Sequence, residues 1–306
     1  MVSTAVSDAV ARVYWLHALS PLHVGSGRGV GFIDLPVIRE KATGRPIVPG
    51  STMKGIMRSR FASRPDLDGW VDAAFGRSGD DAGNAGALVF SDARLVLMPV
   101  RSLYGTFAWA TSPLTLGWLG RDLRTAGVRD VAAIPEVSGS GALVTASSCL
   151  AGPDGKLYLE ELDFEARRED GGNAADVWAR LLGDVLFAGD PEWKSVFVDR
   201  FVVVDEDTFS LLAETGTEVT ARVRLKEDTK TVDSGGLWYE ENLPAESVLA
   251  GLIWCERIWA RDGRKDIEPS ALVEKFCSDP LRCQIGGKTT VGRGLVRCLF
   301  QGGDGR

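Results

Sequence analysis

The stretch PLHVGSGRGVGFIDLPVIREKATGRPIVPGSTMKG, residues 21–55, combines a glycine-rich loop, one isolated acidic residue and a run of basic residues. The glycines of this loop stand at four alternate positions from Gly25 to Gly31, and Asp34 follows among apolar neighbours. Glycine lets a backbone approach a ligand closely and point N–H groups at it. The stretch therefore suggests a contact with phosphate, and the spacing of its glycines narrows the kind of phosphate.

The glycine spacing argues against the two common nucleotide-binding loops. The dinucleotide fingerprint G-x-G-x-x-G fails because Val30 or Phe32 stands at its final glycine, and an extended segment follows in place of a helix. Near the other end of the chain, GGKTTVGRG (286–294) lacks the first glycine of a Walker A loop, because Arg282 occupies that position. Two glycine loops beside basic residues favour an extended sugar–phosphate backbone. The alternative for each loop is that its glycines only form turns.

A helix is predicted directly after the loop, in VPGSTMKGIMRSRFA, with Ser51 as its N-cap. Four apolar residues follow helical spacing and should face a core: Met53, Ile56, Met57 and Phe61. Lys54 and Arg58 are four residues apart, so they share another face and present two cations together. The alternative is an ordinary solvated face.

The rest of the chain mixes predicted strands and helices without a repeat of 20 to 50 residues. Strands are predicted at 11–19, 87–100, 142–149, 156–167, 195–204, 247–260 and 292–300. Helices are predicted at 112–127, from about 174 to 187, at 205–214 and at 266–276, with a loop at 76–86 and a hairpin at 217–244. This mixture fits an α+β fold better than regular β-α alternation.

The composition is that of a soluble globular protein, with 44% apolar and 25% charged residues among 306. No apolar run reaches the roughly 18 residues of a membrane span, and the N-terminus does not resemble a secretory signal. The five cysteines lack C-x-x-C spacing, which favours a reducing cytoplasm. With two histidines in the chain, any metal should be a hard cation held by carboxylates or phosphate.

The charge distribution points to a localised polyanion site, although the net charge is −7. Residues 1–64 hold nine basic and three acidic residues, a net charge of +6, which leaves −13 for the remainder. Residues 281–299 carry four basic residues and no acidic one. Basic ends on an acidic body are typical of nucleic-acid binding at one place. The alternative is ordinary fluctuation of charge along the chain.

Four motifs in order along the chain resemble the RAMP superfamily of CRISPR-associated proteins: SPLHVGSG (20–27), VPGSTMKGIMRSRF (48–61), VFSDARL (89–95) and IGGKTTVGRGLVR (285–297). More narrowly, HVGSGRGVGFIDLPVIREKATGRPIVPGS (23–51) and TKTVDSGGLWYEENLPAES (229–247) resemble the repeated backbone subunit of the type III-B (Cmr) effector complex. Each motif is weak alone, and their order over nearly the whole chain makes the resemblance specific.

The resemblance implies an α+β fold with an RRM-like, ferredoxin-like palm. A single RAMP domain would span residues 1–306, with a helical and loop insertion at about 64–140 and a protruding thumb hairpin at 215–245. Copies would stack along a CRISPR RNA together with other effector subunits. Each thumb would interrupt the guide–target duplex, and single-stranded target RNA would be cut nearby with Mg²⁺ or Mn²⁺. The implied location is cytoplasmic, with no membrane partner.

Asp34 matches the cleavage residue of this family. RNA cleavage can use the substrate's own 2′-OH, so a carboxylate would act as a base or bind a hydrated metal ion. The alternative is that Asp34 only caps a turn. His23 matches a position near the RNA, where it would contact phosphate, assist catalysis or be structural. Glu240 would add a second carboxylate, although Asn242 stands where the family often has an aromatic residue.

The remaining implied contacts are with RNA. Trp238 and Tyr239 would wedge against a base, or pack at the hairpin base instead. Five basic residues would hold guide phosphates: Arg28, Lys54, Arg58, Lys288 and Arg293. The chain has no RNP motif, so the palm would not use the stacking aromatics of that motif. Two alternatives remain, a catalytically inactive guide-RNA scaffold and a small-molecule enzyme that binds a nucleotide.

Overall fold

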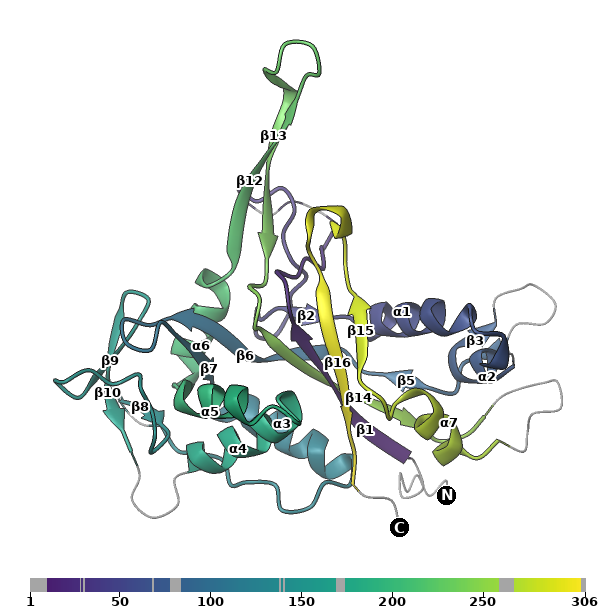
Figure 1. Cartoon of the computed structure of the whole chain (residues 1–306), viewed down its shortest axis with the longest axis horizontal. Helices are drawn as coiled ribbons and strands as arrows, with labels where there is room; N and C mark the ends of the chain where they lie inside the picture. The colour runs from purple at the N-terminus through teal and green to yellow at the C-terminus, as the bar shows by residue number, and fades with distance from the viewer. Residues whose placement is uncertain are drawn as a thin grey trace.

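The computed structural model describes residues 10–27, 29, 31–67, 69–77, 84–137, 139, 141–168, 174–258 and 267–303. It has a mixed α/β body built on one large sheet, from which a long hairpin projects (Figure 1). The predicted α+β mixture is confirmed at this level. Among the described residues, no helix is long and apolar enough to cross a membrane.

The large sheet runs in the order β15-β16-β1-β14-β6-β7-β11-β8-β10-β9. These strands are β1 (Val10–Ala18), β6 (Ala93–Arg101), β7 (Phe107–Thr111), β8 (Gly141–Val144), β9 (Lys156–Leu159), β10 (Leu162–Arg167), β11 (Phe201–Val203), β14 (Val248–Cys255), β15 (Leu281–Gln284) and β16 (Leu295–Gln301). Two short strands join beside this path, β2 (Ile47–Val48) on β6 and β5 (Val89–Phe90) on β14. The sheet's antiparallel centre, β16-β1-β14-β6, brings the two ends of the chain together.

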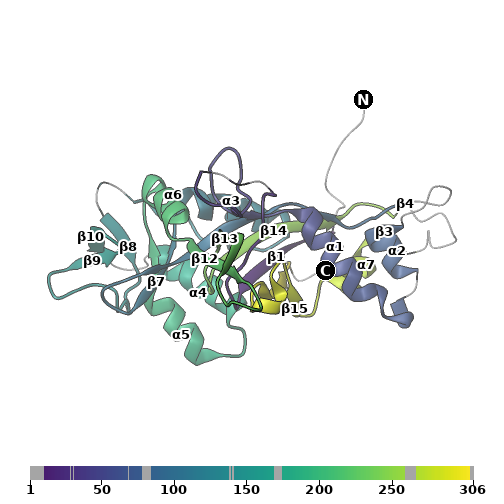
Figure 2. The same ribbon diagram turned by 90° about the horizontal axis from the view of Figure 1, so that it is seen from above.

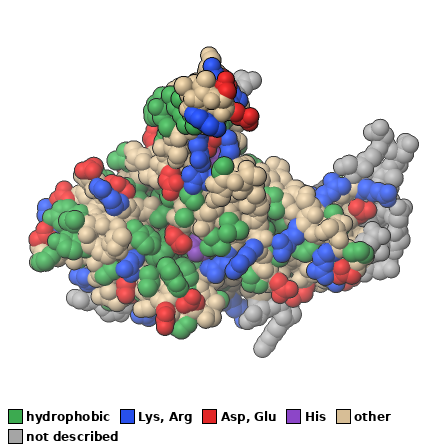
Figure 3. All heavy atoms as spheres, turned by 45° about the horizontal axis from the view of Figure 1, so that its top comes forward, with side chains coloured by type: hydrophobic (Ala, Val, Ile, Leu, Met, Phe, Trp, Pro, Cys, Tyr) green, Lys and Arg blue, Asp and Glu red, His purple; other side chains and the backbone are tan. Residues whose placement is uncertain are grey.

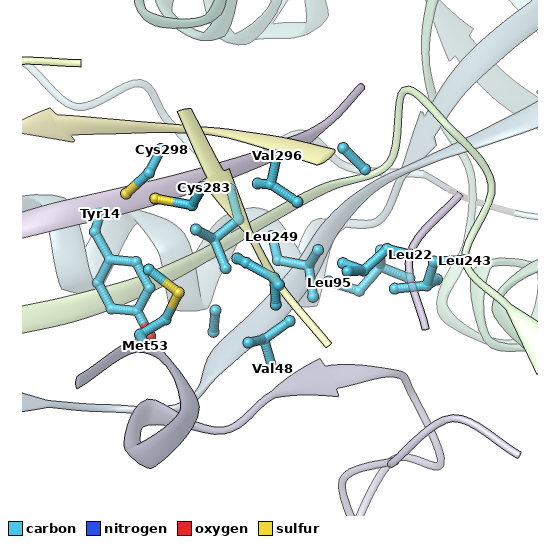
Figure 4. Close-up of a cluster of buried hydrophobic side chains, with 14 of the residues drawn as sticks. Tyr14, Leu22, Val48, Met53, Leu95, Leu243, Leu249, Cys283, Val296 and Cys298 are labelled. Carbon is cyan, nitrogen blue, oxygen red and sulfur yellow. The ribbon is translucent and has the colours of Figure 1, made fainter. Parts of the chain in front are cut away.

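Side chains of β1 alternate between two cores because successive strand residues point to opposite faces. Tyr14 and Leu16 belong to one core, and Val13 and Trp15 belong to the other. The first core, shown in part in Figure 4, is covered by α1 (Gly50–Ala62), α2 (Trp70–Phe75), α6 (Glu206–Thr215) and α7 (Pro269–Phe276). The second is covered by α3 (Pro113–Thr125), α4 (Ala174–Leu186) and α5 (Pro191–Asp199). Both faces of the central strands are therefore buried.

Helix α1 faces the core as its apolar spacing predicts, but its start differs from the prediction. Met53, Met57 and Phe61 are buried, and Ile56 packs partly against them. The N-cap is Pro49, so the prediction of Ser51 as the cap is wrong. The carboxylate of Asp92, across the sheet, accepts the N–H of Gly50 at 2.9 Å and replaces a local cap.

Three strand predictions need correction. The strand expected at 142–149 ends at Val144 as β8, because a turn follows. Residues 156–167 form the two strands β9 and β10, because the chain turns at Glu160, whose φ is +50°. Residues 195–204 begin as helix α5 and only become strand at β11. That helix starts at Pro191, and the side chain of Asp190 caps it by accepting the N–H of Trp193.

Other boundaries follow the sequence more closely. Helices α3, α4, α6 and α7 lie where they are predicted, and the strand expected at 87–100 is interrupted at residues 91–92 between β5 and β6. The segment 64–140 contains the sheet strands β5, β6 and β7 in addition to α2 and α3. It also contains the small pair β3 (Gly76–Arg77) and β4 (Asn84–Ala85), and a short 3₁₀ turn precedes α2 at Pro65–Leu67.

The projecting hairpin consists of β12 (Glu218–Leu225) and β13 (Val232–Asn242), which form a two-stranded sheet of their own. Seen from above, it stands over the middle of the sheet (Figure 2). Its register places Val219 opposite Glu241, Ala221 opposite Tyr239 and Val223 opposite Leu237. The hairpin predicted at 217–244 is confirmed.

Candidate functional site

The segment after the first glycine loop lies along the base of the hairpin. The N–H of Leu35 donates to the carbonyl of Tyr239 at 3.1 Å, and the N–H of Glu241 donates to the carbonyl of Leu35 at 3.0 Å. Leu35 thereby forms a parallel bridge with β13. These backbone hydrogen bonds hold the side chain of Asp34 where the hairpin leaves the body.

Asp34 is an exposed carboxylate with one fixed oxygen. Its Oδ2 accepts the backbone N–H of Tyr239 at 2.8 Å. Its neighbours Ile33 and Leu35 are half-buried, so the backbone on each side is anchored while the carboxylate faces solvent. A substrate can approach such an exposed carboxylate, which can then accept a proton from it.

The side chain of Glu241 also holds the segment after the glycine loop against the base of the hairpin. This carboxylate is buried, and its Oε2 accepts the N–H of Val37 at 2.9 Å. Its Oε1 forms an ion pair with Arg39 and accepts the hydroxyl of Thr217 at 2.9 Å. In the sequence, Arg39 and Glu241 carry no signal of this contact beyond the acidic pair at 240–241.

Glu240 is the centre of a second polar cluster on the other face of β13. Its side chain is 2% exposed and accepts from Lys288 Nζ at 2.8 Å, from Trp238 Nε1 at 2.7 Å and from Arg222 Nε at 3.3 Å. Burial alone would raise the pKa of Glu240, but the hydrogen bonds from Lys288 and Trp238 outweigh it and hold the pKa below its ordinary value. Both carboxylate oxygens are therefore engaged within the protein.

The same cluster joins the second glycine loop to the hairpin. The ammonium of Lys288 lies 5.7 Å from the ring centroid of Trp238, in addition to its ion pair with Glu240. Lys288 itself has φ +66° and precedes a 3₁₀ turn at Thr289–Val291. Trp238 is half-buried, whereas Tyr239 on the opposite face is 38% exposed. The structure thus brings together Trp238, Glu240 and Lys288 from the predicted set.

His23 is buried between three segments. Its Nδ1 lies 2.7 Å from the carbonyl oxygen of Glu241. A carbonyl only accepts, so Nδ1 carries the proton and Nε2 is left toward Gly25. A Cβ at Gly25 would lie 2.9 Å from Nε2, and a Cβ at Gly286 would lie 1.9 Å from the carbonyl oxygen of His23. The histidine therefore holds both glycine loops against the hairpin base.

The predicted guide-binding residues fall in different places. Lys54 and Arg58 lie on α1, to the side of the hairpin (Figure 1). Lys54 is half-buried and donates to the carbonyl of Leu88 at 3.0 Å, and this burial lowers its pKa. Arg293 is half-buried near Lys288, since its N–H donates to the carbonyl of Lys288. Arg28 lies outside the described residues.

The space-filling view shows two different sides of the hairpin (Figure 3). Hydrophobic side chains gather on one side, and Lys and Arg side chains continue from the hairpin onto the body below it. The alternation of β12 explains this: Val219, Ala221 and Val223 share one face, and Arg222 and Arg224 share the other. A basic path therefore reaches the base of the hairpin.

The described side chains do not fit a divalent cation held by protein ligands alone. Within the described ranges, no three His, Cys, Asp or Glu residues are grouped as a metal site. Asp34 is one carboxylate, and the oxygens of Glu240 are occupied by cations and an indole. Metal assistance would need further oxygen ligands from a bound substrate.

Comparison with known proteins gives a consistent result. The profile of the RAMP superfamily matches residues 15–297. The chain is 33% identical over 297 residues to the CRISPR system Cmr endoribonuclease Cmr4 of Pyrococcus furiosus, covering 95% of this chain and 96% of that protein. A shorter match, 37% identical over 86 residues, covers 24% of this chain and 39% of the CRISPR system Cms endoribonuclease Csm3 of Streptococcus thermophilus.

Solved structures show the same fold. The crystal structure of oligomeric Cmr4 from Pyrococcus furiosus superposes with a TM-score of 0.73 at 26% identity, covering 97% of this chain and all of that one. A chain of the cryo-EM structure of the type III-B Cmr-beta complex bound to cognate target RNA gives a TM-score of 0.69 at 20% identity, covering 95% and 96%. The second likeness concerns the fold alone.

Proposed function

Since the chain belongs to the RAMP superfamily, we propose that it is the repeated backbone subunit of a type III-B effector complex. It binds a CRISPR RNA, associates with further copies of itself and with other effector subunits, and cuts the target RNA that pairs with the guide. The endoribonuclease name of the 33%-identical relative and the oligomeric state of the solved Cmr4 support this assignment. A cytoplasmic location stays a prediction.

The observation that carries the proposal is the placement of Asp34. It is a solvent-facing carboxylate, fixed by the N–H of Tyr239 at the point where a long hairpin leaves a basic surface. A hairpin of this kind can separate the guide and target strands locally, and a carboxylate at its base would then lie beside an unstacked target nucleotide. Catalysis requires this positioning first and proton transfer second.

The proposed chemistry needs no protein nucleophile. The 2′-oxygen of the target nucleotide attacks the adjacent phosphorus and forms a 2′,3′-cyclic phosphate, while the bond from phosphorus to the 5′-oxygen breaks. The departing 5′-oxygen takes a proton from water and becomes a 5′-hydroxyl end. Asp34 accepts the proton of the 2′-OH or orients that hydroxyl. Lys288 and the second glycine loop lie near enough to the hairpin base to contact phosphate, since Lys288 already contacts Glu240 and Trp238.

We assign Glu240 an electrostatic role within this site. Its carboxylate orients Lys288 and Trp238, which leaves Asp34 as the exposed carboxylate of the two. His23 acts through the backbone by fixing the loops. Asp34, together with oxygens of the RNA, would hold a divalent cation, Mg²⁺ or Mn²⁺, which would stabilise negative charge at the phosphate, because the described protein residues do not suffice alone.

The palm of this subunit is proposed to be RRM-like. Four antiparallel strands in the spatial order β16-β1-β14-β6, with α1 between β1 and β6 and α7 between β14 and β16, support a ferredoxin-like β-α-β-β-α-β arrangement. Helices cover both faces of these strands. RNA is therefore expected at the loops and hairpin, and not on an open sheet face. The thumb and the insertion at 64–140 complete a single domain in this proposal.

Asp34→Asn in the assembled complex tests the function. Asn keeps an oxygen for the N–H of Tyr239 but cannot accept the proton, so cleavage should fall by about 10²-fold or more, with guide binding and assembly unchanged. The matched control is Asp228→Asn at the exposed tip of the hairpin. Undiminished cutting by Asp34→Asn would favour the alternative of a guide-RNA scaffold whose target is cut by another subunit.

A further inference from the structure

A pair of exposed aromatic rings lies next to Asp34. Phe32 is 75% exposed, and its ring packs edge-to-face on Tyr239 with 6.5 Å between the centroids. The backbone N–H of Tyr239 is the donor that fixes Asp34. Two aromatic side chains and the carboxylate thus form one connected unit, here called the aromatic corner and defined as Phe32, Tyr239 and Asp34.

Phe32 also lines a hollow of about 760 Å³ between the first loop, α6 and the base of β12. Its apolar lining includes Ile33, Pro36, Val37 and Val219. This volume lies within the roughly 300–1,000 Å³ of small-molecule sites. A planar apolar group that stacks on Phe32 would therefore lie at the opening of this hollow.

Polar groups at the hollow are largely used within the protein. Arg39 and Thr217 both bond to the carboxylate of Glu241. A ligand would thus be held mainly by stacking and apolar contact, which every nucleobase can provide. The protein site must accept any base, because the guide RNA and not the protein recognises the sequence of the target.

We propose that the aromatic corner is a stacking platform for the target nucleotide at the cut. Phe32 and Tyr239 receive the face and edge of a base that the hairpin has displaced, and this orients the ribose 2′-OH toward Asp34. Phe32 is a positioning residue, and base identity has little effect on its contact. This inference rests on the proposed function, and it adds a contact between the aromatic corner and the base of the target nucleotide at the cut.

The decisive experiment combines Phe32→Ala with target RNAs that lack one base, in the complete complex. Loss of the ring or of the base should each slow the cut at that site by roughly tenfold, as expected for one stacking contact. When both the ring and the base are absent, the cleavage rate should fall by much less than the product of the two separate effects, because both changes remove the same contact. Phe32→Tyr should restore the rate, and Leu103→Ala, an exposed apolar residue on the β6–β7 loop, serves as the control.

A second measurement separates this proposal from the proposed function. Target RNA with 5-iodouridine at successive positions is irradiated in the Asp34→Asn complex, and crosslinked peptides are identified by mass spectrometry. Crosslinks to Phe32 or Tyr239 at the site of the cut are expected, and they do not depend on cutting. Three results would overturn the platform: losses that multiply, unchanged cleavage by Phe32→Ala, or crosslinks elsewhere in the protein. Failure of Phe32→Ala to assemble would also overturn it, because that result would indicate that Phe32 contacts another copy of the subunit.

Discussion

The carboxylate of Glu240 should stabilise the base of the hairpin, and Glu240→Gln isolates that contribution. Glutamine keeps an oxygen for Trp238 Nε1 and nearly the same shape, but it removes the negative charge and replaces the oxygen facing Arg222 by an amide group that donates. Two cations are then left without their partner, Lys288 at 2.8 Å and Arg222 at 3.3 Å. The change is local because all these residues lie where the hairpin meets the second glycine loop.

The magnitude follows from the exposure of the partners. Removing one partner of a fully buried pair costs roughly 3–5 kcal/mol, whereas exposed pairs contribute about 0–1 kcal/mol. The side chains of Lys288 and Arg222 are 32% and 29% exposed, so water compensates them partly. We expect about 1 kcal/mol for each pair and about 2 kcal/mol in total, near a 30-fold change in the ratio of folded to unfolded protein. Glu240→Ala should lose about 1 kcal/mol more, with the indole hydrogen bond.

The pH dependence has a defined sign. The pKa of Glu240 is lower in the folded protein than its ordinary value of 4.5, so the stabilisation is present above pH 4.5. It is lost as the pH falls from 4.5 through the folded pKa. Urea unfolding and amide exchange at Tyr239 and Glu241 should show the largest gap between wild type and Glu240→Gln at pH 7, and the gap should close in acid.

The control for this prediction is Glu227→Gln, an exposed glutamate on the same hairpin. It should change the unfolding free energy by less than about 0.5 kcal/mol. Equal stability of Glu240→Gln and wild type at pH 7 would refute the reasoning, and so would a gap that persists unchanged in acid.

Two further predictions concern the loops and the guide. Gly286→Ala should destabilise the protein by about 3 kcal/mol or more, because φ is +75° and a Cβ would lie 1.9 Å from the carbonyl oxygen of His23. The neighbouring Gly287 has open space around it and should tolerate Ala, so Gly287→Ala is the control. Equal melting curves for Gly286→Ala and wild type would contradict this packing. Arg58→Gln and Arg293→Gln should each weaken guide binding and reduce the slope of log K against log salt by about 0.7 per lost phosphate contact; parallel salt titrations would remove that arginine from the guide-binding set.

The sequence predicted the elements whose local signals agree with their packing. Helix α1 has apolar spacing that matches its buried face, and the hairpin has polar turn residues between two strands. The prediction failed where tertiary contacts decide. In residues 195–204, a helix capped by Asp190 ends at Asp199 just before strand β11, and only the polar pair Asp199 and Arg200 separates the apolar residues of the two elements.

For the site, the sequence located Asp34, Glu240 and Lys288 but not their relations. A pattern cannot show that Glu240 is buried against Lys288 from a loop about 50 residues away, or that Tyr239 donates its N–H to Asp34. Phe32 carries no sequence signal, because a lone aromatic residue in a glycine loop belongs to no recognisable spacing. Its exposure and its contact with Tyr239 emerge only from the fold.

The contacts of the two glycine loops have a consequence for synthesis of the chain. The N–H of Gly287 donates to the carbonyl of His23, and the N–H of Gly294 donates to the carbonyl of Pro21. β16 likewise pairs with β1. The site is therefore incomplete until residues 286–294 have been synthesised and have left the ribosome. A nascent or truncated subunit that lacks this loop should be unable to capture guide RNA.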